Sequence, residues 1–232
     1  LILKEGPETI AAFSGEPVMG AGCVLMPPAG YWEGVQAILN KYDILLVADE
    51  VICGFGRTGK MFACETFNIT PDVLVVSKQI TSSYMPLSAI LMNDRFYQPI
   101  ADESDRIGSF GHGYTASGHP VATAVGLENL KIIQERDLVG HVADLQDTFL
   151  SGLAELVKHP VVHSSRGIGL IGALEIKPWT DAKPGDAALA VAEAALEAGV
   201  ITRNIGEAVC FCPPLIITAE QINDMFESMR QA

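Results

Sequence analysis

Short apolar runs alternate with segments of helical periodicity along the first 135 residues. The predicted strands are at residues 10–13, 44–48, 73–76 and 89–92. The runs at 44–48 and 73–76 are uninterrupted and β-branched, as is typical of strands buried on both faces of a parallel sheet. Residues 32–41 carry apolar side chains at helical spacing between two strands, which completes a βαβ unit. A short helix is predicted at residues 94–97, so this part of the chain is predicted to be α/β.

The remaining residues have a different pattern. Two amphipathic helices are predicted at residues 121–135 and 139–157, and they lead into mixed strands and helices. These later elements are strands at 169–176, 200–202 and 208–212 and helices at 186–198 and 219–229. We therefore predict a large α/β domain at 1–135, with a mostly parallel sheet and flanking helices, and a smaller α+β domain at 136–232.

Composition and charge narrow the class of protein. Hydrophobic residues make up 49% of the chain, which is enough for a core, and the net charge of −13 argues against nucleic acid or an anionic membrane as a partner. No apolar run approaches the ~20 residues that a membrane span needs, and no basic segment leads into an apolar signal core. The five cysteines have no CxxC spacing, so we expect no metal site. We predict a cytoplasmic protein.

Two charged side chains follow the two buried runs. Asp49 closes the run at 44–48, and Lys78 follows the run at 73–76 after one intervening residue, Ser77. If the strands are parallel, both side chains emerge at carboxyl ends, where open α/β sheets bind ligands. Pyridoxal phosphate needs an amine for a Schiff base and a carboxylate that keeps its pyridine nitrogen protonated. The pair therefore suits this cofactor.

The segment GFGRTG at residues 54–59 matches the dinucleotide pattern GxGxxG. In a nucleotide site these glycines open a long helix, and an acidic residue ends the next strand. Here Pro71 interrupts the following segment and the next strand leads to Lys78. A nicotinamide-binding domain is therefore the disfavoured alternative.

A second glycine-rich segment, GSFGHGYTASGHP, occupies residues 108–120. Its hydroxyl groups and free backbone amides suit phosphate binding. A hydrogen-bonded turn before the helix that Pro120 starts explains the same composition. Both interpretations stay open from the residues alone.

Three segments together resemble a known family. ADEVICGFGRTGKMFACE, SKQITSSYMPLSAI and HGYTASGHPVA occur in the order of the cofactor, lysine and phosphate-threonine motifs of class III (ornithine aminotransferase-like) pyridoxal-phosphate-dependent aminotransferases. The later segment ITRNIGEAVCFCPPLIIT is most similar to ω-amino acid or amine:pyruvate aminotransferases. The resemblance runs through essentially the whole chain and implies the fold type I of pyridoxal-phosphate-dependent transferases. Because chains of this family are longer, we expect a C-terminal part that is incomplete by itself.

The resemblance also implies roles for single residues. Lys78 would form the Schiff base with pyridoxal 5'-phosphate, and Asp49 would pair with its pyridinium nitrogen. Val51 would pack on the cofactor ring. Thr115 would bind the cofactor phosphate of a partner subunit, which implies a homodimer with the site at the subunit interface.

Three further charged residues lie near these motifs. Arg203 falls where ω-aminotransferases place an arginine for the substrate carboxylate, and a bidentate donor suits that group. The alternative is a surface arginine in a turn. Glu50 either orients the site or only neighbours Asp49. For Arg57 we expect a structural salt bridge.

The resulting expectation is an aminotransferase that moves an amino group from an amine or ω-amino acid to a keto acid, with pyruvate as the expected acceptor. One alternative is a class III decarboxylase or aminomutase, because the same lysine and aspartate serve those reactions. A truncated, non-catalytic dimerisation or folding module is the alternative from a different class.

Overall fold

The computed structural model describes residues 1–231, which divide into two compact units. Unit 1 comprises Leu1–Pro17, Pro27–Phe55 and Phe62–Arg136. Unit 2 comprises Val18–Met26, Gly56–Met61 and the chain from Asp137 onward. Two short segments from the first half of the sequence therefore belong with the second unit. That the units are half of a cofactor domain and a small domain stays a prediction.

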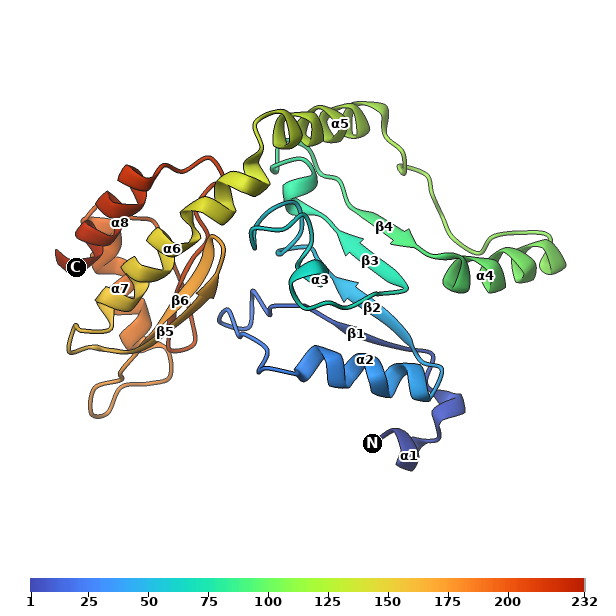
Figure 1. The fold of residues 1–232 in the computed structure, drawn as a ribbon, viewed down its shortest axis with the longest axis horizontal. Helices are drawn as coiled ribbons and strands as arrows, with labels where there is room; N and C mark the ends of the chain where they lie inside the picture. The colour runs from blue at the N-terminus through green and yellow to red at the C-terminus, as the bar shows by residue number, and fades with distance from the viewer. Residues whose placement is uncertain (232) are drawn as a thin grey trace. The chain divides into compact units, whose positions relative to one another are not determined.

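Unit 1 is built on a four-stranded sheet (Figure 1). Its strands are β1 (Ala12–Gly15), β2 (Leu45–Asp49), β3 (Val73–Val76) and β4 (Ala89–Met92), in that spatial order. The first three are parallel, and β4 is antiparallel to β3. The prediction of an α/β region with a mostly parallel sheet is confirmed. β3 and β4 have the predicted bounds, whereas β1 starts two residues later than predicted.

Strand β2 is buried on alternate residues. Leu46 and Ala48 have 0% exposed surface, whereas Leu45 and Val47 are half-buried. The buried positions pack in one core with Trp32 and other residues of helix α2 (Tyr31–Lys41). The prediction of burial on both faces is therefore met only in part, since one face of β2 is fully buried and the other is half-buried.

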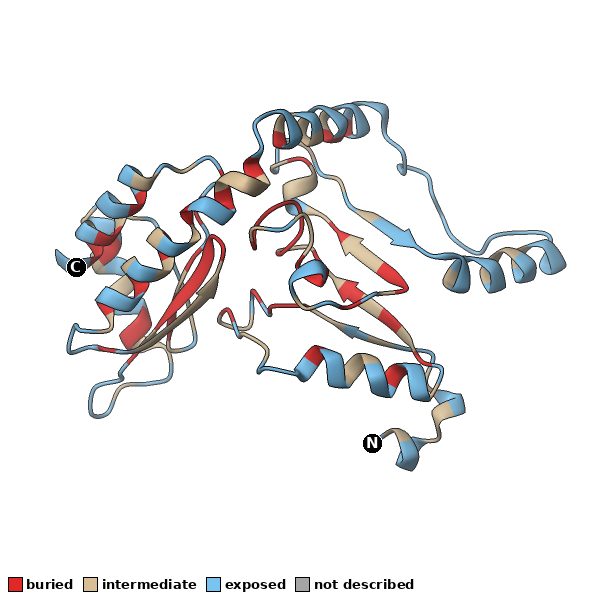
Figure 2. Cartoon of the chain, in the orientation of Figure 1, coloured by how far each residue is buried: buried red, intermediate tan, exposed pale blue. Residues whose placement is uncertain are grey.

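The other helical segments of unit 1 are α1 (Ile2–Glu5), η1 (Pro7–Thr9), α3 (Ala63–Thr66), η2 (Lys78–Ile80), α4 (Asp94–Ile107) and α5 (Pro120–Glu135). The four-residue helix predicted after β4 is in fact the fourteen-residue α4. Its N-cap is Asn93, whose side chain accepts a hydrogen bond from the Phe96 N–H at 3.1 Å. The helix continues through Pro99 and has no buried residue among those described, as its colouring in Figure 2 shows.

Unit 2 contains an antiparallel sheet. Its strands are β5 (Val162–Ile168), β6 (Ile171–Ile176), β8 (Ala208–Phe211) and β7 (Arg203–Ile205), in that spatial order. The predicted strand at residues 200–202 is displaced, because the chain enters the sheet only at Arg203. The predicted strand at 169–176 begins only at Ile171, because residues 169 and 170 form the turn from β5, a strand that the sequence did not predict. The α+β arrangement of this part is confirmed.

Three helices complete unit 2, namely α6 (Leu138–Leu156), α7 (Asp186–Glu197) and α8 (Ala219–Gln231). Helices α6 and α8 meet at Phe149 and Phe226, whose ring centroids are 5.6 Å apart. Gly152 permits this approach, since a Cβ atom there would lie 2.2 Å from the Phe226 ring. The red residues in Figure 2 mark this core between the helices and the sheet. Within the described chain no helix is long and apolar enough to cross a membrane.

Candidate active site

The carboxylate of Asp49 lies at the carboxyl end of β2. Its Oδ1 atom accepts a hydrogen bond from the Val51 N–H at 3.0 Å, which closes a tight turn directly after the strand. The residue is half-buried, and its Oδ2 atom has no hydrogen-bond partner among the described residues. The backbone therefore orients Asp49 through Oδ1, while Oδ2 can accept a hydrogen bond from a ligand.

Lys78 emerges from the neighbouring strand at the same edge of the sheet. Asp49 is in register with Val75, and the Glu50 N–H donates to the Val75 carbonyl at 2.9 Å. Lys78 follows Val75 by three residues and is the first residue of η2. Because β2 and β3 are parallel, their carboxyl ends bring the amine and the carboxylate to one edge, as the sequence predicted.

The backbone at Lys78 has an uncommon conformation. Its φ angle is +43°, in the left-handed region that non-glycine residues seldom adopt, and its side chain is exposed. The loop that follows is closed by two hydroxyl groups. Ser77 Oγ donates to the Leu87 carbonyl at 3.1 Å and Thr81 Oγ1 donates to the Met85 carbonyl at 2.6 Å. These contacts hold the strained segment in place.

Val51 and Thr115 occupy different surroundings within unit 1. Val51 is half-buried in the turn after Asp49, where an apolar side chain can contact a planar ring held by that carboxylate. Thr115 is exposed between α4 and α5, directly after Tyr114, whose carbonyl accepts the Ser117 N–H at 3.0 Å. The glycine-rich segment therefore contains a hydrogen-bonded turn before α5. Ring packing by Val51 and phosphate binding by Thr115 stay predictions.

Arg203 belongs to unit 2. It is the first residue of β7, pairs with Cys210 of β8, and has an exposed side chain. The alternative of a surface arginine in a turn is therefore wrong about the turn, because Arg203 is the first residue of a strand. Binding of a substrate carboxylate by Arg203 stays a prediction.

Glu50 has a structural role that the sequence left open. The residue has 0% exposed surface, and its two carboxylate oxygens accept the N–H groups of Ala63 at 3.0 Å and Cys64 at 2.7 Å. Burial raises the pKa of Glu50, against the opposing effect of its hydrogen bonds with Cys64 and Ala63. Glu50 therefore binds the start of α3 to the end of β2, and it supports the strand from which Asp49 emerges.

Arg57 is buried within unit 2. Its Nη1 atom donates to the carbonyl groups of Leu170 at 2.9 Å and Pro213 at 2.5 Å. These two hydrogen bonds give Arg57 a structural role, because they connect the segment 56–61 to two later parts of the chain. A salt bridge of Arg57 stays a prediction.

The glycines of GFGRTG serve close packing. A Cβ atom at Gly59 would lie 3.3 Å from the Ala143 backbone in α6, and one at Gly56 would lie 3.4 Å from Val139. Both glycines also have positive φ angles, of +105° at Gly56 and +79° at Gly59. The next helix, α3, has four residues. These features explain the pattern without a nucleotide.

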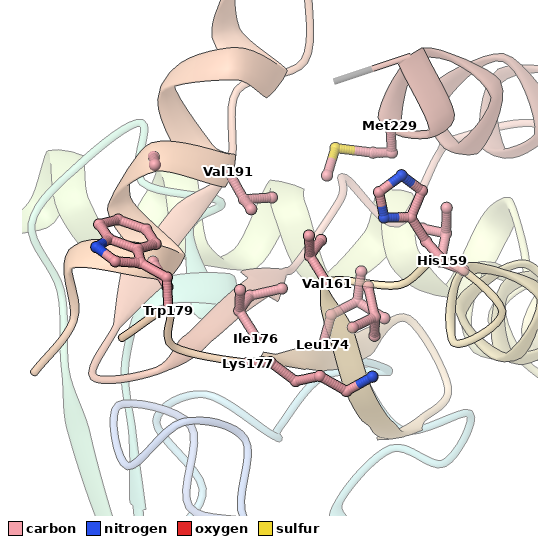
Figure 3. Close-up of a pocket in the computed structure, with 12 residues that line it drawn as sticks. His159, Val161, Leu174, Ile176, Lys177, Trp179, Val191 and Met229 are labelled. Atoms are coloured by element: carbon pink, nitrogen blue, oxygen red, sulfur yellow. The ribbon is translucent and has the colours of Figure 1, made fainter. Parts of the chain in front are cut away.

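An apolar pocket of about 250 Å³ lies in unit 2, and none of the site residues described above lines it. Figure 3 shows Ile176, Val191 and Met229 around it, with the Lys177 amine directed away from them. Because its lining offers no carboxylate and no amine directed inward, the pocket lacks the chemistry of the strand ends.

The residues at the strand ends fit pyridoxal phosphate. Lys78 supplies an exposed amine, Asp49 supplies an available carboxylate oxygen, and Val51 supplies an apolar contact beside it. An aldehyde, a basic ring nitrogen and a ring face are the complementary groups of this cofactor. The three residues therefore offer one complementary group for each of these three parts of the cofactor.

Comparison with known proteins gives matches along the whole chain. A family model described as aminotransferase class-III matches residues 1–232. A γ-aminobutyrate transaminase 3 of Solanum lycopersicum, described as chloroplastic, is 46% identical over 230 residues, which are 97% of this chain and 44% of that protein. A vanillin aminotransferase of Capsicum chinense is 44% identical over 230 residues, covering 97% of this chain and 50% of that protein.

Solved structures give a similar result. A crystal structure of the ω-transaminase from Pseudomonas jessenii in complex with PMP superposes with a TM-score of 0.96 at 52% identity, covering 99% of this chain and 52% of that one. A structure described as a transaminase with L-ala has a TM-score of 0.95 at 52% identity, covering 99% of this chain and 55% of that one. The chain spans about half the length of the curated relatives it matches, with shares of 44% to 50%.

Proposed function

The chain belongs to the class-III aminotransferase family, and from this premise we propose that the protein transfers an amino group from an amine or ω-amino acid to a keto acid. The main observation behind the proposal is that Lys78 and Asp49 lie at the carboxyl ends of adjacent parallel strands. The pairing supports transfer through pyridoxal 5'-phosphate, the cofactor of this family. When bound, this cofactor supplies an aldehyde that takes up amines and a protonated ring that accepts electrons.

Lys78 has two tasks in this proposal. Its Nζ atom binds the cofactor at rest, and after release it moves a proton to and from the substrate carbon. The amine must be neutral for the second task, and it must reach the substrate from a defined direction. Its place at the start of η2, on a backbone held by the closed loop, supports a defined direction.

Asp49 and Val51 act on the ring of the cofactor. Asp49 Oδ2 holds a proton at the ring nitrogen, while Oδ1 remains bound to the Val51 N–H and keeps the carboxylate oriented. The Val51 side chain covers one face of the ring and excludes water from it. Both groups belong to the turn directly after β2, so one short segment supplies this part of the site.

Arg203 and Thr115 are assigned to the substrate and to a partner subunit. An exposed guanidinium at the start of β7 can bind the carboxylate of a keto acid in bidentate geometry. Thr115 is exposed on a loop, which suits a contact with the cofactor phosphate of a second copy in a homodimer. Relatives named as γ-aminobutyrate transaminases support an ω-amino acid as donor, and pyruvate is the proposed acceptor.

The test uses the protein at its natural length, incubated with pyridoxal 5'-phosphate, pyruvate and a ¹⁵N-labelled donor. We expect ¹⁵N-alanine by mass spectrometry with γ-aminobutyrate or a simple primary amine. Lys78→Gln should abolish it, and Lys60→Gln, at another exposed lysine, should not. Borohydride reduction and peptide mapping should place the cofactor on Lys78. A label on Lys60, or products that form without pyruvate, would contradict the proposal, the latter in favour of a decarboxylase or aminomutase.

Two further properties are proposed with it. Mass measurement in solution tests the homodimer, and a monomer with full turnover would argue against a shared site. A cytoplasmic location stays a prediction, which cell fractionation tests, since the relatives include proteins named as mitochondrial and chloroplastic.

A further inference from the structure

The side chain of Asn129 in α5 forms hydrogen bonds with the loop that contains Lys78. Asn129 Nδ2 donates to the carbonyl groups of Gln79 at 2.7 Å and Ile80 at 3.2 Å, and Asn129 Oδ1 accepts from Ser82 Oγ at 2.7 Å. Gln79 Nε2 donates to the same Ser82 hydroxyl at 3.0 Å. Both polar atoms of the Asn129 amide are thus used on the six residues that begin with Lys78.

The orientation of this amide follows from its partners. Two carbonyl oxygens can only accept hydrogen bonds, so the NH₂ group of Asn129 must face Gln79 and Ile80. A carboxylate at this position would oppose both carbonyls, although it has nearly the same shape. The site therefore requires an amide and not merely a side chain of this size.

The segment needs such support because its backbone is unfavourable. Lys78, Ser82 and Ser83 have φ angles of +43°, +49° and +64°, and none of them is a glycine. Residues of this kind persist only where surrounding contacts determine their conformation. Asn129 supplies contacts from a helix that is 47 to 50 residues away in the sequence.

Helix α5 comes close to the loop at a second point. Gly126 is three residues before Asn129 and therefore on the same face of the helix. A Cβ atom at Gly126 would lie 2.9 Å from Leu87 and 3.7 Å from the Ile80 carbonyl. The glycine lets α5 approach, and the approach brings Asn129 within hydrogen-bond distance of the loop.

We propose that Asn129 is a positioning residue, which fixes the backbone of residues 78–83 and thereby the direction of the Lys78 amine. Lys78 is exposed, so the conformation at its own Cα atom decides where the side chain starts. The inference rests on the proposed function, because the direction of the amine matters only if Lys78 binds the cofactor and moves the proton.

The experiment compares Asn129→Asp and Asn129→Ala with the matched control Asn40→Asp, which makes the same change at an exposed position of α2. Hydrogen–deuterium exchange of the cofactor-free, natural-length protein is the first readout. We expect the amides of residues 78–84 to exchange about 10-fold faster in both Asn129 variants, as loss of hydrogen bonds of ordinary strength predicts, and to be unchanged in the control.

The second readout is the reaction at Lys78 itself. The rate of borohydride-trappable attachment of pyridoxal 5'-phosphate to Lys78 should fall about 10-fold, and kcat should fall similarly while the KM of the donor stays within about 2-fold. Asn129→Asp should be at least as impaired as Asn129→Ala, despite its shape. If either variant does not fold, Ser82→Ala removes one of the same hydrogen bonds and should show the same pattern more weakly.

Two outcomes separate the inference from the proposed function. The positioning role would be overturned if Asn129→Asp equalled Asn40→Asp in its amide exchange, its rate of cofactor attachment and its kcat. A loss of donor binding as large as the loss in kcat would also overturn it. Full turnover of Lys78→Gln would instead overturn the proposed function. An inactive Lys78→Gln beside an unaffected Asn129→Asp would refute only the role of Asn129.

Discussion

Replacement of Glu50 by glutamine tests whether a buried carboxylate stabilises the end of β2. Glu50 has 0% exposed surface, and its oxygens accept the N–H groups of Ala63 at 3.0 Å and Cys64 at 2.7 Å. These N–H groups are at the start of α3 and have no partner within the helix. Glutamine keeps one oxygen acceptor but turns an NH₂ group towards the other N–H.

The structure sets the size of the effect. Loss of one hydrogen bond to a charged acceptor costs about 1.5–3 kcal/mol, and the N–H left behind is buried. A neutral amide also avoids the cost of burying a charge, which offsets part of this loss. We therefore expect Glu50→Gln to lower the free energy of unfolding by about 1–3 kcal/mol. Glu50→Ala leaves both N–H groups unpaired and should cost about twice as much.

The assay is urea unfolding of the natural-length protein, with Glu65→Gln as control. Glu65 lies in the same helix and accepts the Phe62 N–H at 2.9 Å, but it is exposed. Glutamine at this capping position retains the acceptor, so the control should change the free energy of unfolding by less than about 0.5 kcal/mol. Equal losses in the two variants would refute the argument from burial.

The pH dependence provides a second check. Burial raises the pKa of Glu50 from its ordinary value of 4.5 in spite of the hydrogen bonds that lower it. A raised pKa in the folded state means that the folded protein binds this proton more tightly than the unfolded chain. The resulting stabilisation is complete below the unfolded pKa and is lost as the pH rises through the folded pKa. The cost of Glu50→Gln should thus be larger at pH 5 than at pH 8, and the opposite trend would contradict the assignment.

Three further predictions concern other carboxylates and the arginine. Asp49→Asn should retain cofactor binding but lower kcat at least about 100-fold, because the ring proton loses its counter-charge; near-normal turnover would argue against that role. Arg203→Ala should raise KM for the keto acid about 10-fold and affect an amine without a carboxylate less; equal losses would make Arg203 structural. Asp72→Asn should cost about 1–3 kcal/mol at pH 7 in urea unfolding, because its side chain accepts the Leu46 N–H at 2.9 Å and pairs with Arg95 at 3.0 Å. Burial would raise the pKa of Asp72, but these bonds lower it below its ordinary value of 3.8. The stabilisation by Asp72 is therefore present above pH 3.8 and is lost as the pH falls through the folded pKa. A cost of Asp72→Asn that persists unchanged at pH 2 would contradict this.

Much of the fold, and the placement of Asp49 and Lys78 at one edge of the sheet, could be predicted from the sequence. The runs at 73–76 and 89–92 became β3 and β4 with unchanged bounds, because short uninterrupted apolar runs favour buried strands for local reasons. Asp49 ends β2 and Lys78 follows the end of β3 by two residues, so parallel pairing was sufficient to bring them to one edge. Local pattern was less informative at α4, where it predicted four residues and the helix extends through Pro99 to Ile107.

Only the tertiary structure decided the roles of Glu50, Arg57 and Asn129. Glu50 binds the start of α3, 13 and 14 residues away, and Arg57 donates to a carbonyl 113 residues away. Nothing in the helical pattern around Asn129 indicates its role, which depends on hydrogen bonds to the loop of Lys78 that form only in the folded chain. The physical reason is that periodicity is a property of neighbouring residues, whereas a hydrogen bond between distant residues exists only after packing has closed the chain between them.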